Sequence, residues 1–279
     1  METGRASRTA FRVAMRRAAH QVLDRPCVLH DPVAVPLLGE HFVLDHDGER
    51  HPVARAFRAF MVARSRYAED RLGEAVATGV TQYVVLGAGL DTFAFRNPHR
   101  ALRVFEVDFP ATQEWKRGLL AEAGIGASTS VCFVPLDFER KTLAEGLAET
   151  EFDFQSPAFF GWLGVVPYLT RDAFRSTLRV IGKMPPGSGT SFDYALDPET
   201  LSPLRRKAFE VLAARVAAAG EPFQLFFTPD ELEAEFRSAG FQRIENADSD
   251  ALNALYFSGR ADGLQLPSDG IGMLSTAWV

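Results

Sequence analysis

The sequence predicts an α/β fold built on a mostly parallel, doubly wound sheet, and three observations lead to that fold class. Short apolar runs with the composition of β-strands recur from residue 81 onward. Stretches with helical periodicity separate most of these runs, which implies right-handed crossovers between parallel strands. Hydrophobic residues make up 47% and charged residues 24% of the 279 residues, as in a globular protein with a sizeable core.

Each element follows from its own local pattern. Five apolar runs predict the parallel strands, at residues 83–86, 102–107, 130–134, 158–162 and 189–194. Helical periodicity predicts helices between them, at residues 111–123, 142–150 and 170–183. The later pattern predicts an inserted helix at 199–220, a helix at 228–240, and strands at 241–246, 254–260 and 271–278. Strands joined without a helix must pair in antiparallel fashion, so we expect the sheet to end on a hairpin.

The segment before the first strand predicts helices and one loop. Residues 5–17 carry five Arg and no acidic residue, as a transit peptide does, but Ser7 is also a suitable cap for a helix. Because the apolar periodicity continues to Leu23 without a break, we interpret this segment as a folded helix. The next residues indicate a polar surface loop rather than a metal site, since its histidines match no ligand spacing: His41, His46 and His51.

A long helix is expected from Pro52, a residue suited to the first helical turn. Arg64 falls in the middle of its apolar face, where a charged side chain must either reach solvent or meet an anion. Arg64 is therefore a candidate for binding a carboxylate, whereas Arg71, near the edge of the face, is interpreted as structural. Three further arginines point away from the face and are expected to be solvated: Arg55, Arg58 and Arg66.

The composition excludes several classes of function. A net charge of −6 argues against a surface for nucleic acid, which needs clustered Lys and Arg. The longest apolar runs, such as residues 158–169, are shorter than the roughly 20 residues that span a membrane. Cys27 and Cys132 cannot build a disulfide framework, which suits a reducing cytoplasm. We expect a cytoplasmic protein that binds neither nucleic acid nor membrane, with its oligomeric state left open.

The carboxyl ends of the first three predicted strands form a candidate nucleoside pocket. Gly87 and Gly89 make a Gly-x-Gly turn, which lets the backbone approach a ligand. Thr92 replaces the third glycine of the dinucleotide fingerprint, which weakens a pyrophosphate interpretation. Glu106 and Asp108 both satisfy the spacing for an acid that accepts from ribose hydroxyls. The third strand is followed by an acceptor for an adenine amino group and a ring for the base, Asp137 and Phe138.

Three segments together resemble the leucine carboxyl methyltransferase family: residues 84–92 (VVLGAGLDT), 105–110 (FEVDFP) and 161–169 (GWLGVVPYL). The GAGLDT and VDFP motifs are much more specific than Gly-x-Gly, and the similarity covers nearly the whole chain. This family includes bacterial O-methyltransferases of polyketide and other secondary metabolism. The resemblance implies a class I, S-adenosylmethionine-dependent, Rossmann-like fold with a seven-stranded sheet, N-terminal helices and an inserted helical lid.

The resemblance also implies roles for single residues. Arg64 matches the family arginine that holds the carboxylate of the cofactor's methionine part, which Gly87 approaches, and Asp108 takes the ribose hydroxyls. Further cofactor-binding positions are implied at Gly89, Asp91, Asp137, Phe138 and, by a looser match, Arg8. Some members carry Glu where this chain has Leu163, so the motif does not identify what holds the cofactor's ammonium. Backbone carbonyls near Gly87 and Gly161 are the candidates.

The reaction follows from the cofactor. A sulfonium methyl group is electrophilic by itself, so the enzyme must mainly place an oxygen in line with it and exclude water. A carboxylate needs no base, whereas a phenol or alcohol does. Tyr168 either faces the acceptor or is an ordinary capping or core residue.

We therefore predict an S-adenosylmethionine-dependent O-methyltransferase that acts on a carboxylate or hydroxyl of a small metabolite and uses no metal. Two alternatives stay open: an NAD-dependent oxidoreductase and a non-catalytic S-adenosylmethionine-binding protein. Residues 1–279 are expected to form one methyltransferase domain. Its parts are a helical cap (1–78), a core (79–198 and 226–279) and a helical lid (199–225). We expect the acceptor pocket between cap and lid.

Overall fold

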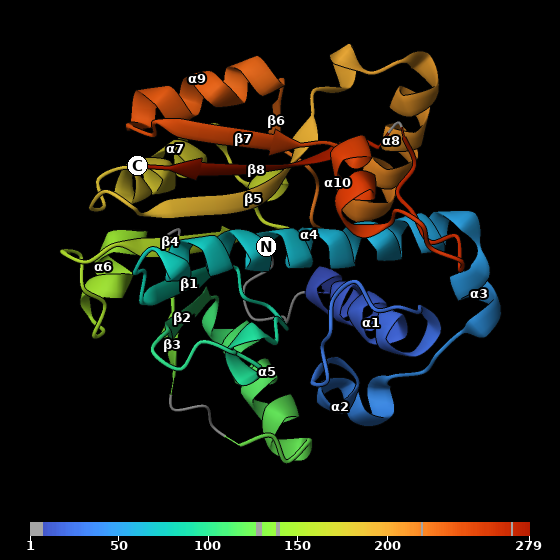
Figure 1. The fold of residues 1–279 in the computed structure, drawn as a ribbon, viewed down its shortest axis with the longest axis horizontal. Coiled ribbons are helices and arrows are strands. Elements are labelled where there is room, and N and C mark those ends of the chain that lie inside the picture. Colours follow the sequence, from blue (N-terminus) through green and yellow to red (C-terminus); the bar gives the residue numbers. More distant parts are fainter. Residues whose placement is uncertain (1–7, 127–129, 138–139, 219, 269) are drawn as a thin grey trace.

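A computed structural model of the chain describes residues 8–126, 130–137, 140–218, 220–268 and 270–279 (Figure 1). Within these residues the strands form one sheet in the order β3-β2-β1-β4-β5-β8-β7, and the two-residue β6 pairs with β5. Their bounds are β1 Gln82–Leu86, β2 Arg103–Asp108, β3 Val131–Pro135, β4 Ala158–Trp162, β5 Gly189–Leu196, β6 Phe226–Phe227, β7 Arg243–Ala247 and β8 Gly272–Trp278. The strands β1 to β5 are parallel, whereas β8 is antiparallel to β5 and β7. The predicted mostly parallel sheet with an antiparallel end is confirmed.

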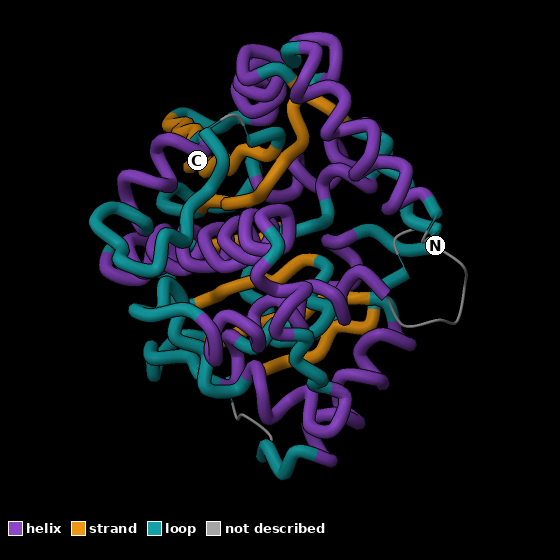
Figure 2. The backbone as a smooth tube through the Cα atoms, turned by 90° about the vertical axis from the view of Figure 1, so that its right-hand side faces the viewer, coloured by secondary structure: helices purple, strands orange, loops and turns teal. Residues whose placement is uncertain are grey.

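Helices cover both faces of this sheet, and in Figure 2 the strands run through the interior between them. The helices are α1 Arg8–Leu23, α2 Ala34–Leu38, α3 His46–Arg50, α4 Pro52–Ala77, α5 Pro110–Glu122, α6 Leu143–Ala148, α7 Arg171–Ile181, α8 Pro203–Ala217, α9 Pro229–Ala239 and α10 Ser249–Tyr256. Among the described helices, none is both long and apolar enough to cross a membrane.

The alternation of side chains along β1 shows which helices lie on which face. Val84 and Leu86 belong to a core that includes side chains of α6, α7 and α9. Tyr83 and Val85 point the other way, into a core completed by Leu72 and other residues of α4. The strands β1 and β4 are buried over their full length, as expected for parallel strands covered on both faces. In Figure 1, α4 accordingly runs across the sheet.

Two parts of the predicted element order are wrong. The strand expected at residues 254–260 does not form, because α10 extends to Tyr256 and residues 257–259 form a turn. The Asp248 side chain accepts from the Ala251 amide and caps this helix, while Leu252 is buried in the core that α4 shares. Thus α10 and a loop connect β7 to β8, in place of the expected strand, while β7 and β8 still pair in antiparallel fashion. The expected polar loop before Pro52 contains α2 and α3, and α3 begins at His46.

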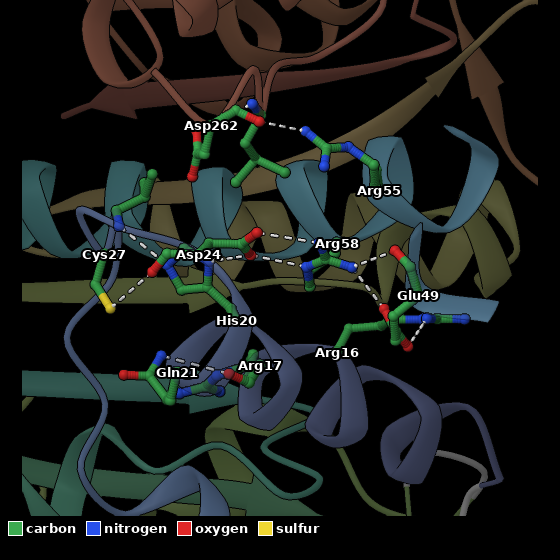
Figure 3. A network of polar contacts seen from close by, with 12 residues as sticks. Arg16, Arg17, His20, Gln21, Asp24, Cys27, Glu49, Arg55, Arg58 and Asp262 are labelled. Carbon is green, nitrogen blue, oxygen red and sulfur yellow. Dashed lines mark hydrogen bonds and ion pairs between the residues drawn. The ribbon is translucent and has the colours of Figure 1, made fainter. Parts of the chain in front are cut away.

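The prediction that Arg58 is solvated is also wrong. Its side chain is buried and only 2% exposed. Figure 3 shows its guanidinium between two carboxylates: Nε donates to Asp24 at 2.7 Å and Nη1 to Glu49 at 2.6 Å. Burial acts to raise the pKa of Asp24, but hydrogen bonds from His20 and Arg58 outweigh it and lower that pKa to about 2. The charged network therefore joins α1, α3 and α4. The periodicity of α4 alone did not reveal it, because the acids that pair with Arg58 lie outside this helix, Asp24 directly after α1 and Glu49 on α3.

Candidate functional site

A cavity of about 1620 Å³ lies at the carboxyl ends of the parallel strands, where ligands of such sheets bind. Side chains of α1, α4 and α8 complete its wall. Seven of the residues predicted to form the site line this one cavity: Arg64, Gly87, Gly89, Asp91, Asp108, Asp137 and Tyr168. The Arg8 side chain and Phe138, also predicted to bind the cofactor, lie outside the described residues. Arg66 is exposed and pairs with Asp70, away from the residues that line the cavity.

The turn after β1 depends on its glycines. Gly87 and Gly89 have φ angles of 63° and 47°, in the left-handed region that favours glycine. A Cβ atom at Gly87 would lie 2.4 Å from Cγ2 of Val165. The close approach of these two loops therefore also requires glycine at this position. The turn leads into a short 3₁₀ helix, Phe93–Phe95, with no α-helix before β2. All residues between β1 and β2 are described, and none of them forms an α-helix whose N-terminus could bind a pyrophosphate. This absence disfavours the NAD-dependent oxidoreductase.

Only one of the two acids of β2 faces the cavity. Asp108 is the last residue of the strand, and its two oxygens accept from the amides of Gly89 and Phe109. Burial raises the pKa of Asp108, against the lowering effect of those amides. Glu106 lies two residues deeper and is paired with Lys116 of α5 at 2.6 Å. Sequence spacing alone did not show which of the two acids lines the cavity. Their positions along β2 do, because only the last residue of the strand reaches it.

Arg64 pairs with an acid that sequence reasoning missed. Its Nη1 donates to Oδ2 of Asp193 in β5 at 2.9 Å, and both residues are 6% exposed. The second oxygen of Asp193 accepts from the Gly164 amide. The Nε atom of Arg64 is buried and has no hydrogen-bond partner within the described residues. An acid between the apolar neighbours Phe192 and Tyr194 was the available signal, because a buried strand rarely carries an unpaired charge.

Asp91 stabilises the turn through hydrogen bonds to α1 and to the backbone that follows the turn. Its Oδ2 accepts from Nη1 of Arg17 at 2.8 Å, and its Oδ1 from the Phe93 amide at 2.7 Å. Arg17, on α1, also donates to Asp31 and Thr92, both at 2.6 Å. Burial acts to raise the pKa of Asp91, but the positive charge of Arg17 and its neighbours lowers it below its ordinary value. The replacement of the third fingerprint glycine by Thr92 therefore has a structural use, since its hydroxyl completes this network.

The remaining predicted residues lie on two other walls of the cavity. Asp137 follows β3, and its carboxylate is 3.5 Å from Nε of Arg140. Tyr168 ends the 3₁₀ helix Val166–Tyr168, and its ring packs on Phe223 with 5.3 Å between centroids. Burial raises the pKa of Tyr168 to about 12, so its hydroxyl keeps its proton at neutral pH.

Replacement of Gly87 by Ala tests the turn. We expect the free energy of unfolding to fall by about 1–2 kcal/mol from the left-handed backbone alone, with a further loss from the contact with Val165. Urea unfolding measures this change. Gly73→Ala is the control, because a Cβ there meets nothing within 4 Å and helix propensity predicts a gain of about 0.5–1 kcal/mol. Equal stability changes in the two variants would contradict the described turn.

Comparison with known proteins indicates one class. The family described as leucine carboxyl methyltransferase matches residues 10–182. YktD of Bacillus subtilis, named as an inferred S-adenosyl-L-methionine-dependent methyltransferase, is 32% identical over 95% of both chains. A protein of Mycolicibacterium paratuberculosis with the same description is 32% identical over 72% of this chain and 77% of its own.

Two crystal structures share the fold at low sequence identity. One is described as an inferred methyltransferase from Thermobifida fusca, with a TM-score of 0.57, 18% identity, and coverage of 99% of this chain and 96% of the other. The second is a DUF574 family protein from Streptomyces avermitilis, with a TM-score of 0.56, 16% identity, and coverage of 94% and 96%. These likenesses concern the fold alone.

The fold, the motifs and the relatives define a class I, S-adenosylmethionine-dependent methyltransferase. The chain belongs to the leucine carboxyl methyltransferase family, as its motifs predicted. The residues present fit this cofactor in two respects. The Nε of Arg64, which finds no hydrogen-bond partner among the described residues, is a donor in a cavity wall, and Gly87 leaves the backbone open where a side chain would intrude.

Proposed function

We propose that this methyltransferase transfers the methyl group to an oxygen atom of a small metabolite within the cavity at the strand ends. The observation that carries the proposal is the continuity of this cavity, which extends from the Gly-x-Gly turn to the lid helix α8. When bound, S-adenosylmethionine supplies an electrophilic methyl group. In this proposal Arg64 binds the methionine carboxylate, Asp108 accepts from the ribose hydroxyls and Asp137 accepts from adenine. Asp91 acts indirectly, by holding the turn.

The acceptor end of the cavity combines apolar and cationic side chains. Val53 at the start of α4 is 59% exposed, and Leu204 and Val211 on α8 are 75% and 50% exposed, yet all three line the cavity. Exposed cations line it as well, namely Arg12, Lys207 and Arg215, against the acid Glu221. This combination suits a metabolite with an apolar body and a negative charge, and therefore favours a carboxylate among the two oxygen nucleophiles.

Labelled methyl transfer tests the proposal. The protein is incubated with methyl-labelled S-adenosylmethionine and panels of aliphatic acids, aromatic acids and phenols. We expect labelled product from the acids, and release of the label as methanol in mild alkali, since esters hydrolyse there and methyl ethers do not. Alkali-stable label would assign a hydroxyl acceptor, and persistent absence of product from all three panels and from a metabolite extract would contradict the proposal.

The pH dependence of the reaction tests whether a base is used. Because burial holds the Tyr168 pKa at about 12, this phenol is protonated throughout the neutral range and cannot accept a proton there. We expect kcat/KM for a carboxylate acceptor to be flat from about pH 6 to 9, and Tyr168→Phe to keep that flat profile. If kcat/KM rises with pH near neutrality and Tyr168→Phe removes that rise, Tyr168 acts as a base, which would contradict the prediction.

A further inference from the structure

One charge of the proposed cofactor lacks an assigned partner. The methionine part of S-adenosylmethionine carries a carboxylate and an ammonium on the same carbon atom. The side chain of Leu163, at the position where some family members carry Glu, offers no acceptor for the ammonium. An ammonium removed from water requires hydrogen-bond acceptors, and preferably a negative charge.

Asp193 places a negative charge at this part of the cavity. It lies on the same wall as Arg64, which it contacts at 2.9 Å, and both line the cavity. Its two oxygens accept one described side-chain or backbone hydrogen bond each, from Arg64 and from Gly164. Each carboxylate oxygen has two lone pairs, so the group keeps capacity for further donors.

Gly164 keeps this pair accessible and in place. Its φ angle of 71° lies in the left-handed region, and its amide donates to Asp193. A Cβ atom there would lie 2.9 Å from Nη2 of Arg64, so the absence of a side chain leaves room beside the guanidinium. The chain thus keeps a cation and an anion side by side in a largely buried wall, an arrangement that folding alone does not favour over apolar residues of similar volume.

We propose that Asp193 binds the ammonium of the cofactor's methionine part while Arg64 binds its carboxylate, so that an ion pair of the protein recognises a zwitterion. This inference rests on the proposed function of the cavity. In this inference Asp193 replaces the backbone carbonyls near Gly87 and Gly161 as the main acceptor for the ammonium. It also explains how the chain tolerates Leu163, since a carboxylate from β5 supplies the charge that the β4 motif lacks.

Calorimetric titration with three ligands tests the inference. S-adenosylhomocysteine carries both charges, its deaminated analogue keeps only the carboxylate, and 5′-methylthioadenosine has neither. For the wild type we expect the deaminated analogue to bind about 10- to 100-fold more weakly than S-adenosylhomocysteine, the range for a hydrogen bond to a charged group. For Asp193→Asn we expect that difference to shrink to a few-fold or less, and 5′-methylthioadenosine to bind as it does to the wild type.

Each other outcome overturns a distinct statement. If Asp193→Asn weakens both amino-acid ligands equally, Asp193 only positions Arg64 and does not bind the ammonium. If the wild type binds the deaminated analogue as tightly as S-adenosylhomocysteine, no ammonium site exists, and this result needs no variant to fold. If the wild type binds none of the three ligands, the cofactor site itself is misplaced. Asp70→Asn is the control, because that carboxylate pairs with Arg66 outside the cavity and should change none of the affinities.

Discussion

Arg64→Ala is expected to weaken the binding of S-adenosylhomocysteine by about 2–3 kcal/mol, roughly 30- to 150-fold, as measured by calorimetric titration. In the proposed site the guanidinium offers the methionine carboxylate a positive charge and an Nε donor that has no partner within the described residues. The same change leaves Asp193 buried without its cation. We therefore also expect the free energy of unfolding to fall by about 3–5 kcal/mol, so titrations are made at a temperature where the variant is folded.

Arg71→Ala is the matched control for this prediction. Arg71 lies on the same helix, pairs with Glu74 and Glu245, and does not line the cavity. Its replacement should leave the affinity unchanged. Unaltered affinity in Arg64→Ala, with the protein shown to be folded, would remove Arg64 from the cofactor site.

Arg17→Ala is expected to lower the free energy of unfolding by about 3–5 kcal/mol, because two carboxylates lose a buried cation. Arg17 is 4% exposed and binds Asp31, Asp91 and Thr92 at once. This network fastens α1 to the turn that carries Gly87 and Gly89. Arg17→Lys should recover only part of the loss, since one ammonium lacks the fork geometry that reaches all three partners. Urea unfolding of both variants measures these differences.

An exposed ion pair supplies the comparison. Arg66→Ala removes a contact with Asp70 at 2.8 Å on the surface of α4, for which we expect a loss of at most about 1 kcal/mol. If Arg17→Ala destabilises the protein no more than Arg66→Ala, the buried network is not what attaches α1 to the turn.

The sheet could be predicted from the sequence because each parallel strand is a short apolar run bounded by turn residues. The strands β1 and β4 are buried throughout, and their residues are correspondingly apolar apart from Gln82. The prediction of a strand in place of α10 is wrong because the short apolar stretch fits both periods, and the Asp248 cap lies outside residues 254–260. The division of residues 1–279 into cap, core and lid stays a prediction.

The candidate site was predictable where a motif fixes position, as for Gly87 and Asp108 at the strand ends. The partners of charged residues were not, because they come from distant segments. Asp193 reaches Arg64 across 129 residues of sequence, and Arg17 reaches Asp91 across 74. The prediction of a solvated Arg58 is wrong for the same reason, since only the folded chain shows Asp24 and Glu49 beside it.

A crystal structure of the protein with S-adenosylhomocysteine bound tests the central claim most directly. We predict the methionine carboxylate at Arg64, its ammonium at Asp193, the ribose hydroxyls at Asp108 and the adenine beside Asp137. The sulfur atom should then face the part of the cavity that α8 and the start of α4 line. A ligand bound elsewhere, or bound here with its amino-acid part directed away from Arg64 and Asp193, would contradict the account.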